Sequence, residues 1–291
     1  VLVAGPPAPT SVSKRFATAA AVRAATLRGQ SAVAQAPSPG QEASTAAHAA
    51  APEDVLVLPR SVKGRPLVRV GVRVLPYAPA SLVVADTVRV IGRDNACRGT
   101  RRLALPEGLE AIGAHCFCSR VLEGPVPIPA SVRSIGEGSF EYAVCRLEHT
   151  GTVVHVSADQ LLTCFLTDAP DGVPFDYARY DELLRSGKNL PDRLGAVLHR
   201  LTVPYRLEDT TRAALVAYLR EHEREAQQRV AQEGERAMVE ALVRDGFIDN
   251  RTFERQIELL RACNRTDCVL YLMEQHREQA RPSSARERFA L

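Results

Sequence analysis

The chain has 291 residues, of which 45% are hydrophobic, 24% are charged and only 5% are aromatic. This length and composition are typical of a globular protein with one large domain or two small ones. Its net charge of +3 is far from the basic balance of nucleic-acid-binding domains, so we expect no nucleic-acid partner. No run of about 18 apolar residues is free of charge, so we expect no membrane span.

Residues 1–52 differ from the rest of the chain in composition. They contain seventeen Ala and six Pro, and Phe16 is their only aromatic residue. Such a segment cannot bury enough apolar surface to offset its conformational entropy, so we expect it to be disordered. Its apolar stretch resembles a secretory leader, but Arg23 and Arg28 interrupt it. We therefore expect a cytoplasmic protein, with a secreted or cell-surface protein as the alternative.

The cysteines also favour a reducing compartment. Their number is odd, and they are spread unevenly along a long chain, unlike the framework of a small disulfide-rich domain. We expect free thiols that pack as small apolar groups. The seven cysteines are Cys97, Cys116, Cys118, Cys145, Cys164, Cys263 and Cys268.

Three copies of one short pattern follow one another in the middle of the chain. They start at Leu82, Leu103 and Val126, with periods of 21 and 23 residues. Each copy begins with an apolar-x-apolar triplet, typical of a short strand with alternate side chains turned inward, and continues to an Ile-Gly pair. The glycine indicates a bend where a Cβ would be crowded. Because one copy cannot bury its own apolar face, we expect the copies to stack and share a core.

The copies 103–117 and 126–140 resemble leucine-rich repeats of the BspA-like type. The resemblance is carried by the sequences LALPEGLEAIGAHCF and VPIPASVRSIGEGSF, and it extends over about residues 82–145. The family has a Cys three residues after the Phe, where this chain has Arg120 and Ala143. The resemblance implies a bacterial protein with a β-solenoid that recognises other proteins through its strand surface.

A helical period replaces the strand pattern from about residue 175. We expect helices that begin near Tyr177, Leu194, Leu215, Met238, Phe253 and Val269, the third running on through residues 220–236. Gly246 is a candidate C-terminal cap, and Asn250 is a candidate N-terminal cap. The segment 238–274 is similar to ankyrin-like helix pairs, although it lacks their T-P-L-H motif.

These patterns predict an α+β chain: a short leucine-rich-repeat β-solenoid, then an α-helical bundle or helical-hairpin domain, after a disordered N-terminus. The expected segments are a disordered region at 1–52, a BspA-like repeat domain at 53–170, a helical domain at 171–278 and a disordered tail at 279–291.

The sequence contains little that indicates catalysis. No phosphate-binding G-x-x-x-x-G-K-[ST] motif is present, and Ser139 lacks the glycine that a G-x-S-x-G nucleophile needs. His115, Cys116 and Cys118 are the best metal-like cluster, but they lack paired C-x₂₋₄-C spacing. We expect neither an enzyme nor a cofactor, and we expect Cys116 to pack inward as a core thiol.

The leading hypothesis is a non-enzymatic protein-interaction module. In the strand register of the repeats, Arg102, Ala104 and Pro127 point outward and form the expected protein-binding face, whose partner the sequence does not identify. The alternatives are a cell-surface or secreted adhesin-like repeat protein, and a metal-binding regulator that uses His115, Cys116 and Cys118.

Overall fold

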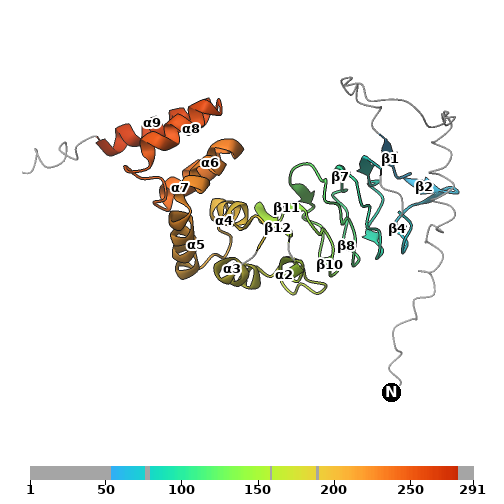
Figure 1. Cartoon of the computed structure of the whole chain (residues 1–291). Coiled ribbons are helices and arrows are strands. Elements are labelled where there is room, and N and C mark those ends of the chain that lie inside the picture. The colour runs from blue at the N-terminus through green and yellow to red at the C-terminus, as the bar shows by residue number, and fades with distance from the viewer. Residues whose placement is uncertain (1–53, 76–78, 158, 188–189, 281–291) are drawn as a thin grey trace, which may run out of the picture. The chain divides into compact units, whose positions relative to one another are not determined.

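The computed structural model describes residues 54–75, 79–157, 159–187 and 190–280 (Figure 1). The expected disordered segment 1–52 lies outside the described residues, as does the expected tail 279–291 beyond its first two positions, which end the last helix.

The chain divides into two units. The first unit contains the chain up to residue 151 together with 155–176, and the second contains 152–154 and the residues from 177 onward. The loop 171–176, which we expected to begin the helical domain, therefore groups with the strands.

The first unit is a β-solenoid made of short parallel strands (Figure 1). Its strands are β1 Val55–Val57, β2 Ser61–Val62, β3 Arg65–Pro66, β4 Arg69–Val70, β5 Ser81–Val83, β6 Val90–Ile91, β7 Arg102–Ala104, β8 Ala111–Ile112, β9 Val126–Ile128, β10 Ser134–Ile135 and β11 Val144–Leu147. The last strand of the chain is β12 Thr152–His155, of which residues 152–154 group with the second unit. One parallel sheet has the order β1-β5-β7, a second has the order β10-β8-β6-β4, and β9 pairs in parallel with β11.

The repeat isoleucines stack in register across the second sheet. Ile91 is opposite Ile112, which is opposite Ile135, and Val70 precedes them in the same row. This register confirms the predicted stacking of the three copies. It also reveals an earlier turn, β1 to β4, in which Val70 stands 21 residues before Ile91. The antiparallel hairpin β2–β3, inserted between β1 and β4, lengthens the spacing from β1 to β5.

The glycine that follows each of these residues allows the turns to approach closely. A Cβ added at Gly92 would lie 2.8 Å from the carbonyl carbon of Gly71, and one at Gly113 would lie 2.5 Å from the backbone nitrogen of Arg93. Backbone atoms cannot move aside as the end of a side chain can. The expected crowding at the repeat glycine is therefore present between successive turns.

One buried polar position also repeats in the stack. Asn95, Cys116 and Ser139 each donate a hydrogen bond to the carbonyl of the repeat glycine in the preceding turn, at 2.9, 3.2 and 2.8 Å. Buried backbone carbonyls need a hydrogen-bond donor. The side chain at this position supplies one to the glycine carbonyl, which does not bond within the strand ladder. Cys116 is fully buried, as predicted.

Aromatic rings close the last turn of the solenoid. Phe117 and Phe140 lie 5.5 Å apart between their centroids, Phe140 and Phe165 lie 6.0 Å apart, and Phe165 meets Phe175 edge-on at 5.4 Å. The segment that supplies the last two rings begins with the short helix α2, Asp159–Leu162, and hydrogen-bonds to β10 through the amide of Ile135. This segment covers apolar surface that has no further repeat to pack against.

The second unit is helical. Its helices are α3 Tyr177–Ser186, α4 Arg193–Thr202, α5 Asp209–Glu221, α6 Glu223–Glu233, α7 Arg236–Arg244, α8 Phe253–Ala262 and α9 Thr266–Ala280. The prediction of one helix through residues 220–236 was wrong, because the helix breaks at His222, where φ is −114°. Gly246 follows α7 with a φ of +72°, as expected for a glycine cap.

The predicted N-terminal cap of α8 was also wrong. Asn250 is exposed, and the residue before the helix is Thr252. The Thr252 hydroxyl accepts the amide of Asp249 at 2.9 Å, while an Asp249 carboxylate oxygen accepts the amide of Thr252 at 3.2 Å. This reciprocal pair satisfies the amides of Asp249 and Thr252 at the start of the helix without a contribution from Asn250.

A buried ion pair joins α3 to α4. Arg200 is completely buried, and its guanidinium donates to both carboxylate oxygens of Asp181 at 2.6 and 2.9 Å. It also donates to the carbonyls of Val203 and Tyr205 at 3.3 and 2.8 Å. Four hydrogen bonds from the guanidinium group therefore compensate the burial of this charge.

Candidate protein-binding face

Outward-pointing side chains form columns across the strands of the solenoid. In one column Val57 is opposite Val83, and Val83 is opposite Ala104. By the repeat alignment this column continues to Pro127, which is opposite Arg146. The residues between them point inward, since Leu82 is 1% exposed and Ile128 is fully buried. Strand alternation therefore separates a core side from a surface side.

We define the outer strand face as Val55, Val57, Val83, Arg102, Ala104 and Pro127. Its three valines are 51%, 60% and 37% exposed, in chain order. Single exposed apolar residues are ordinary on a protein surface, but neighbouring ones on adjacent strands indicate a surface that a partner covers. The face thus combines apolar side chains with one positive charge.

Charged side chains border this face. Glu123 accepts hydrogen bonds from Arg101 and Arg102, and its carboxylate lies 2.8 and 3.0 Å from their Nε atoms. The hydrogen bond from Arg101, followed by the pairing with Arg102, lowers the pKa of Glu123 despite some desolvation. This exposed cluster orients the guanidinium groups at the border and adds little to stability.

The structure places the three predicted face residues as follows. Arg102 and Ala104 are exposed, whereas Pro127 is half-buried between the buried Val126 and Ile128. Their role in binding stays a prediction.

The face predicted from the sequence does not contain Val55, Val57 and Val83. Val83 stands 21 residues before Ala104, so the repeat period contained the signal for it. The other two belong to the turn that contains the inserted hairpin, and no regular spacing links them to the later copies.

The structure does not bring His115, Cys116 and Cys118 together as a metal site. His115 is exposed, whereas both thiols are buried and donate to backbone carbonyls, at 3.2 Å to Gly92 and 3.2 Å to Gly138. Burial raises the pKa of Cys116 to about 11, which opposes formation of the thiolate that metals bind. Within the described ranges, no three His, Cys, Asp or Glu side chains form a group able to hold a metal ion.

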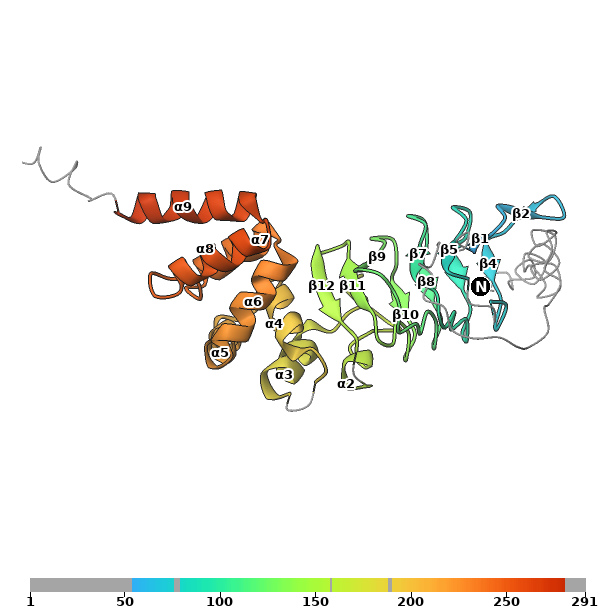
Figure 2. The same cartoon turned by 45° about the horizontal axis from the view of Figure 1, so that its top comes forward.

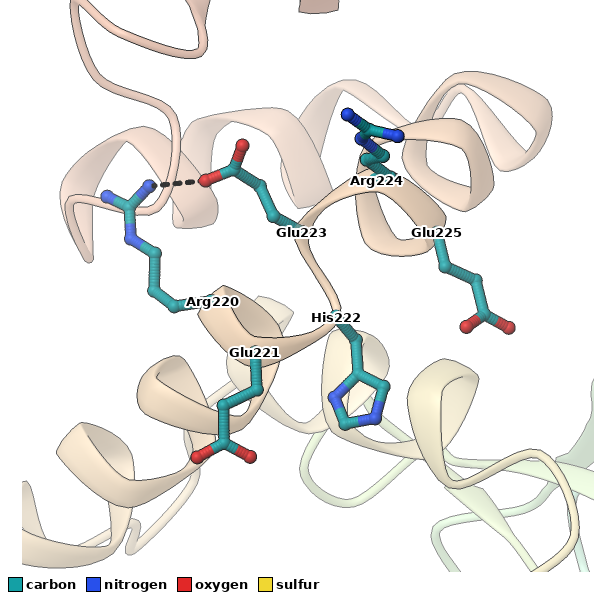
Figure 3. A pocket seen from close by; sticks show the side chains of 6 residues that line it. All are labelled: Arg220, Glu221, His222, Glu223, Arg224 and Glu225. Atoms are coloured by element: carbon teal, nitrogen blue, oxygen red, sulfur yellow. Dashed lines mark ion pairs between the residues drawn. The ribbon is translucent and has the colours of Figure 1, made fainter.

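A pocket lies at the break between α5 and α6 (Figure 3). It is lined by six consecutive residues, 220–225, and Arg220 and Glu223 form an ion pair there at 3.7 Å. Arg220 also donates to Asp249 at 3.0 Å, and the His222 ring lies against Tyr218 with centroids 4.4 Å apart. These contacts stabilise the break between the two helices, and the pocket lacks the apolar lining typical of a small-molecule site.

Searches for similar proteins gave one distant resemblance. No family model matches the chain, and no curated protein matches it. The solved structure of a leucine-rich repeat protein from T. pallidum is 26% identical over 30% of this chain and 53% of its own length, with a TM-score of 0.23. The chain thus spans about half the length of that protein. Across the described parts of the chain, no helix has the length and apolar character needed to cross a membrane.

Proposed function

We propose that this protein is a non-enzymatic interaction scaffold that binds a partner protein through the outer strand face. The observation that carries the proposal is the contiguous row of Val57, Val83 and Ala104, exposed on paired strands of a rigid solenoid. A repeat stack can vary such outward residues without disturbing its core, because alternate positions serve the two functions separately.

The border of the face supports the same proposal. Arg102 lies beside the apolar row, and arginine is enriched at the energetically important positions of protein interfaces. An apolar centre with charged groups at its edge is the common arrangement of a protein-binding surface. The same proposal includes that the protein has no enzymatic activity.

We further propose that the repeats are of the BspA-like type, that the helices form ankyrin-like pairs, and that the protein acts in a reducing compartment. The closely spaced repeat glycines support the first part. All seven cysteines are free thiols, which supports the third. Alkylation of protein freshly released from cells would test the compartment. Seven reactive thiols after denaturation are expected, and oxidised cysteines would contradict it.

A comparison of three full-length chains tests the binding face. We would couple the wild type, a Val83→Glu/Ala104→Glu variant and a Val72→Glu/Val121→Glu control to a solid support and expose them to cell lysate. The control residues are 51% and 50% exposed but lie outside the face. A protein retained by the wild type and the control, and lost from the face variant, is the expected result.

The retained protein would then be purified and titrated against the same three chains. Affinity should fall at least about tenfold for the face variant, since each charge would lie against apolar surface. Equal retention and equal affinity for all three chains would contradict the proposal.

A further inference from the structure

The charge of the solenoid is divided between its two halves. Residues 54–102 contain ten basic and three acidic side chains, a net charge of +7, whereas residues 103–176 contain three basic and ten acidic ones, a net charge of −7. The two halves cancel in the total, so composition conceals the division. The end of the stack that begins at β1 is therefore strongly basic, and a partner at this end is selected by negative charge.

The same end of the stack has an open strand edge. β1 ends the β1-β5-β7 sheet in the described part of the chain, and Figure 2 shows the hairpin β2–β3 at this end, beside β1 and β4. The hairpin and its flanks contain Arg60, Lys63 and Arg65.

The backbone bonds of β1 show which of its groups face the open side. The carbonyl of Asp54 accepts from Ser81 at 3.0 Å, and the amide of Leu58 donates to Val83 at 2.9 Å. In a parallel pair, alternate residues bond the same neighbour, so positions 54, 56 and 58 are directed at β5. The amides and carbonyls of Val55 and Val57 are therefore directed away from β5, toward the open edge.

We propose that this edge binds an acidic, extended peptide segment of a partner protein, which adds a strand beside β1. The backbone groups of Val55 and Val57 supply the hydrogen bonds, their exposed side chains supply apolar contact, and Lys63 and Arg65 attract the acidic side chains. The inference rests on the proposed function, for which it names the chemistry of the partner and the manner of binding.

The charge distribution argues against other occupants of the edge. A second copy of the chain in a symmetric, edge-to-edge pair would bring two ends of +7 together, which is unfavourable. Residues 1–53 contain four basic and two acidic side chains, so they lack the negative charge that this end selects. Nucleic acid would be attracted by the charge, but single strands bind on aromatic platforms, and the described part of 54–102 contains no aromatic residue.

Fluorescence anisotropy with the full chain tests the inference. The probe is a labelled peptide of alternating Glu and Val, about eight residues long, which matches the length of a protein strand. The comparison probes are an alternating Lys–Val peptide, a Glu–Pro peptide that lacks the required amides, and a labelled oligothymidine. We expect the Glu–Val peptide to bind, and each comparison probe to bind at least about tenfold more weakly.

Two variants locate the site on β1. Val57→Pro removes an amide on the open side while keeping the bonds to β5, and edge strands accept proline. Lys63→Glu/Arg65→Glu reverses the charge of the hairpin and leaves the strand backbone unchanged. Both should weaken Glu–Val binding about tenfold, whereas the control Arg255→Glu/Arg277→Glu, on exposed positions of α8 and α9, should not.

Several results would overturn the inference. They are absence of Glu–Val binding, unchanged binding by both edge variants, and tighter binding of oligothymidine than of the Glu–Val peptide. If the lysate comparison identifies a partner that depends on Val83 and Ala104 while these results occur, the proposed function stands and the open edge is not its site.

Discussion

The solenoid and the helical unit are stabilised in different ways. In the solenoid a few contacts recur at every turn: a glycine in close approach to the preceding turn, and a side chain that donates to the carbonyl of that glycine. In the helical unit the principal polar contacts occur once each, as in the pair of Arg200 and Asp181. Repeated contacts spread the stability of the solenoid over its turns, whereas single contacts concentrate the stability of the helical unit in a few residues.

The loss of Arg200 is expected to have the largest effect. Arg200→Met leaves the Asp181 carboxylate buried without its partner, and removal of one member of a buried ion pair costs about 3–5 kcal/mol. Urea unfolding followed by the helical circular dichroism signal would measure the change. The double variant Asp181→Leu/Arg200→Met should recover most of the lost stability, because no unpaired charge remains. A cost below about 1 kcal/mol for the single variant would show that the pair behaves like a surface pair.

The repeated polar position in the solenoid should give a smaller, graded effect. The Asn95 side chain accepts the amides of Val74 and Leu75, both at 2.9 Å, and donates to two carbonyls, whereas Ser139 makes one bond of each kind. Asn95→Leu should lower the free energy of unfolding by about 2–3 kcal/mol and Ser139→Ala by about 1 kcal/mol. The first change costs more because it leaves more buried backbone groups without a hydrogen-bond partner. Hydrogen exchange of the amides at 74 and 75 would show whether the loss is local. Equal costs would contradict the grading.

The repeat glycines test how closely the turns approach one another. Gly113→Ala places a Cβ against the backbone of Arg93, so we expect a cost of about 1–3 kcal/mol from overpacking. Gly124→Ala is the matched control, because its φ of +70° makes a Cβ unfavourable but no atom lies within 4 Å. The control should cost about 1 kcal/mol from backbone strain alone. A thermal midpoint of Gly113→Ala equal to that of the wild type would show that the turns can separate without cost.

The difference between recurring and single contacts explains how much of the molecule could be predicted. The stacking of the copies at Leu82, Leu103 and Val126 could be read from the sequence, because each turn imposes the same needs on the chain. The outward positions of Arg102 and Ala104 follow from strand alternation and were predicted too.

The features that the sequence did not reveal have no period. The break at His222 falls in a charged stretch without Gly or Pro, so local propensity gave no sign of it. The inserted hairpin lengthens the spacing from β1 to β5, so Val55 and Val57 were not assigned to the face. The pairing of Arg200 with Asp181 depends on how two helices pack, which neither residue indicates alone.

The carboxylate of Glu233 should give the smallest effect, and one that depends on pH. It accepts from Arg229 at 2.5 Å and lies 3.1 Å from the Nε2 of His199. Burial alone would raise its pKa, but the hydrogen bonds and charges of His199 and Arg229 lower the pKa to about 2. Because the folded value lies below the ordinary 4.5, the carboxylate stabilises the fold above pH 4.5, and this contribution is lost as the pH falls toward 2.

Glu233→Gln should therefore destabilise the helical unit by about 1–2 kcal/mol at pH 7 and by much less near pH 2. Glu240→Gln is the control, since Glu240 makes an exposed pair with Arg236 at 2.7 Å and should change stability little at either pH. Unfolding measured at several pH values for both variants gives the comparison. A Glu233→Gln cost that stays constant from pH 7 to pH 2 would indicate that packing around the side chain, and not its charge, stabilises this contact. A matching loss of stability in Glu240→Gln would indicate that an exposed ion pair contributes as much as the partly buried one. That result would contradict the contrast between buried contacts and surface charges.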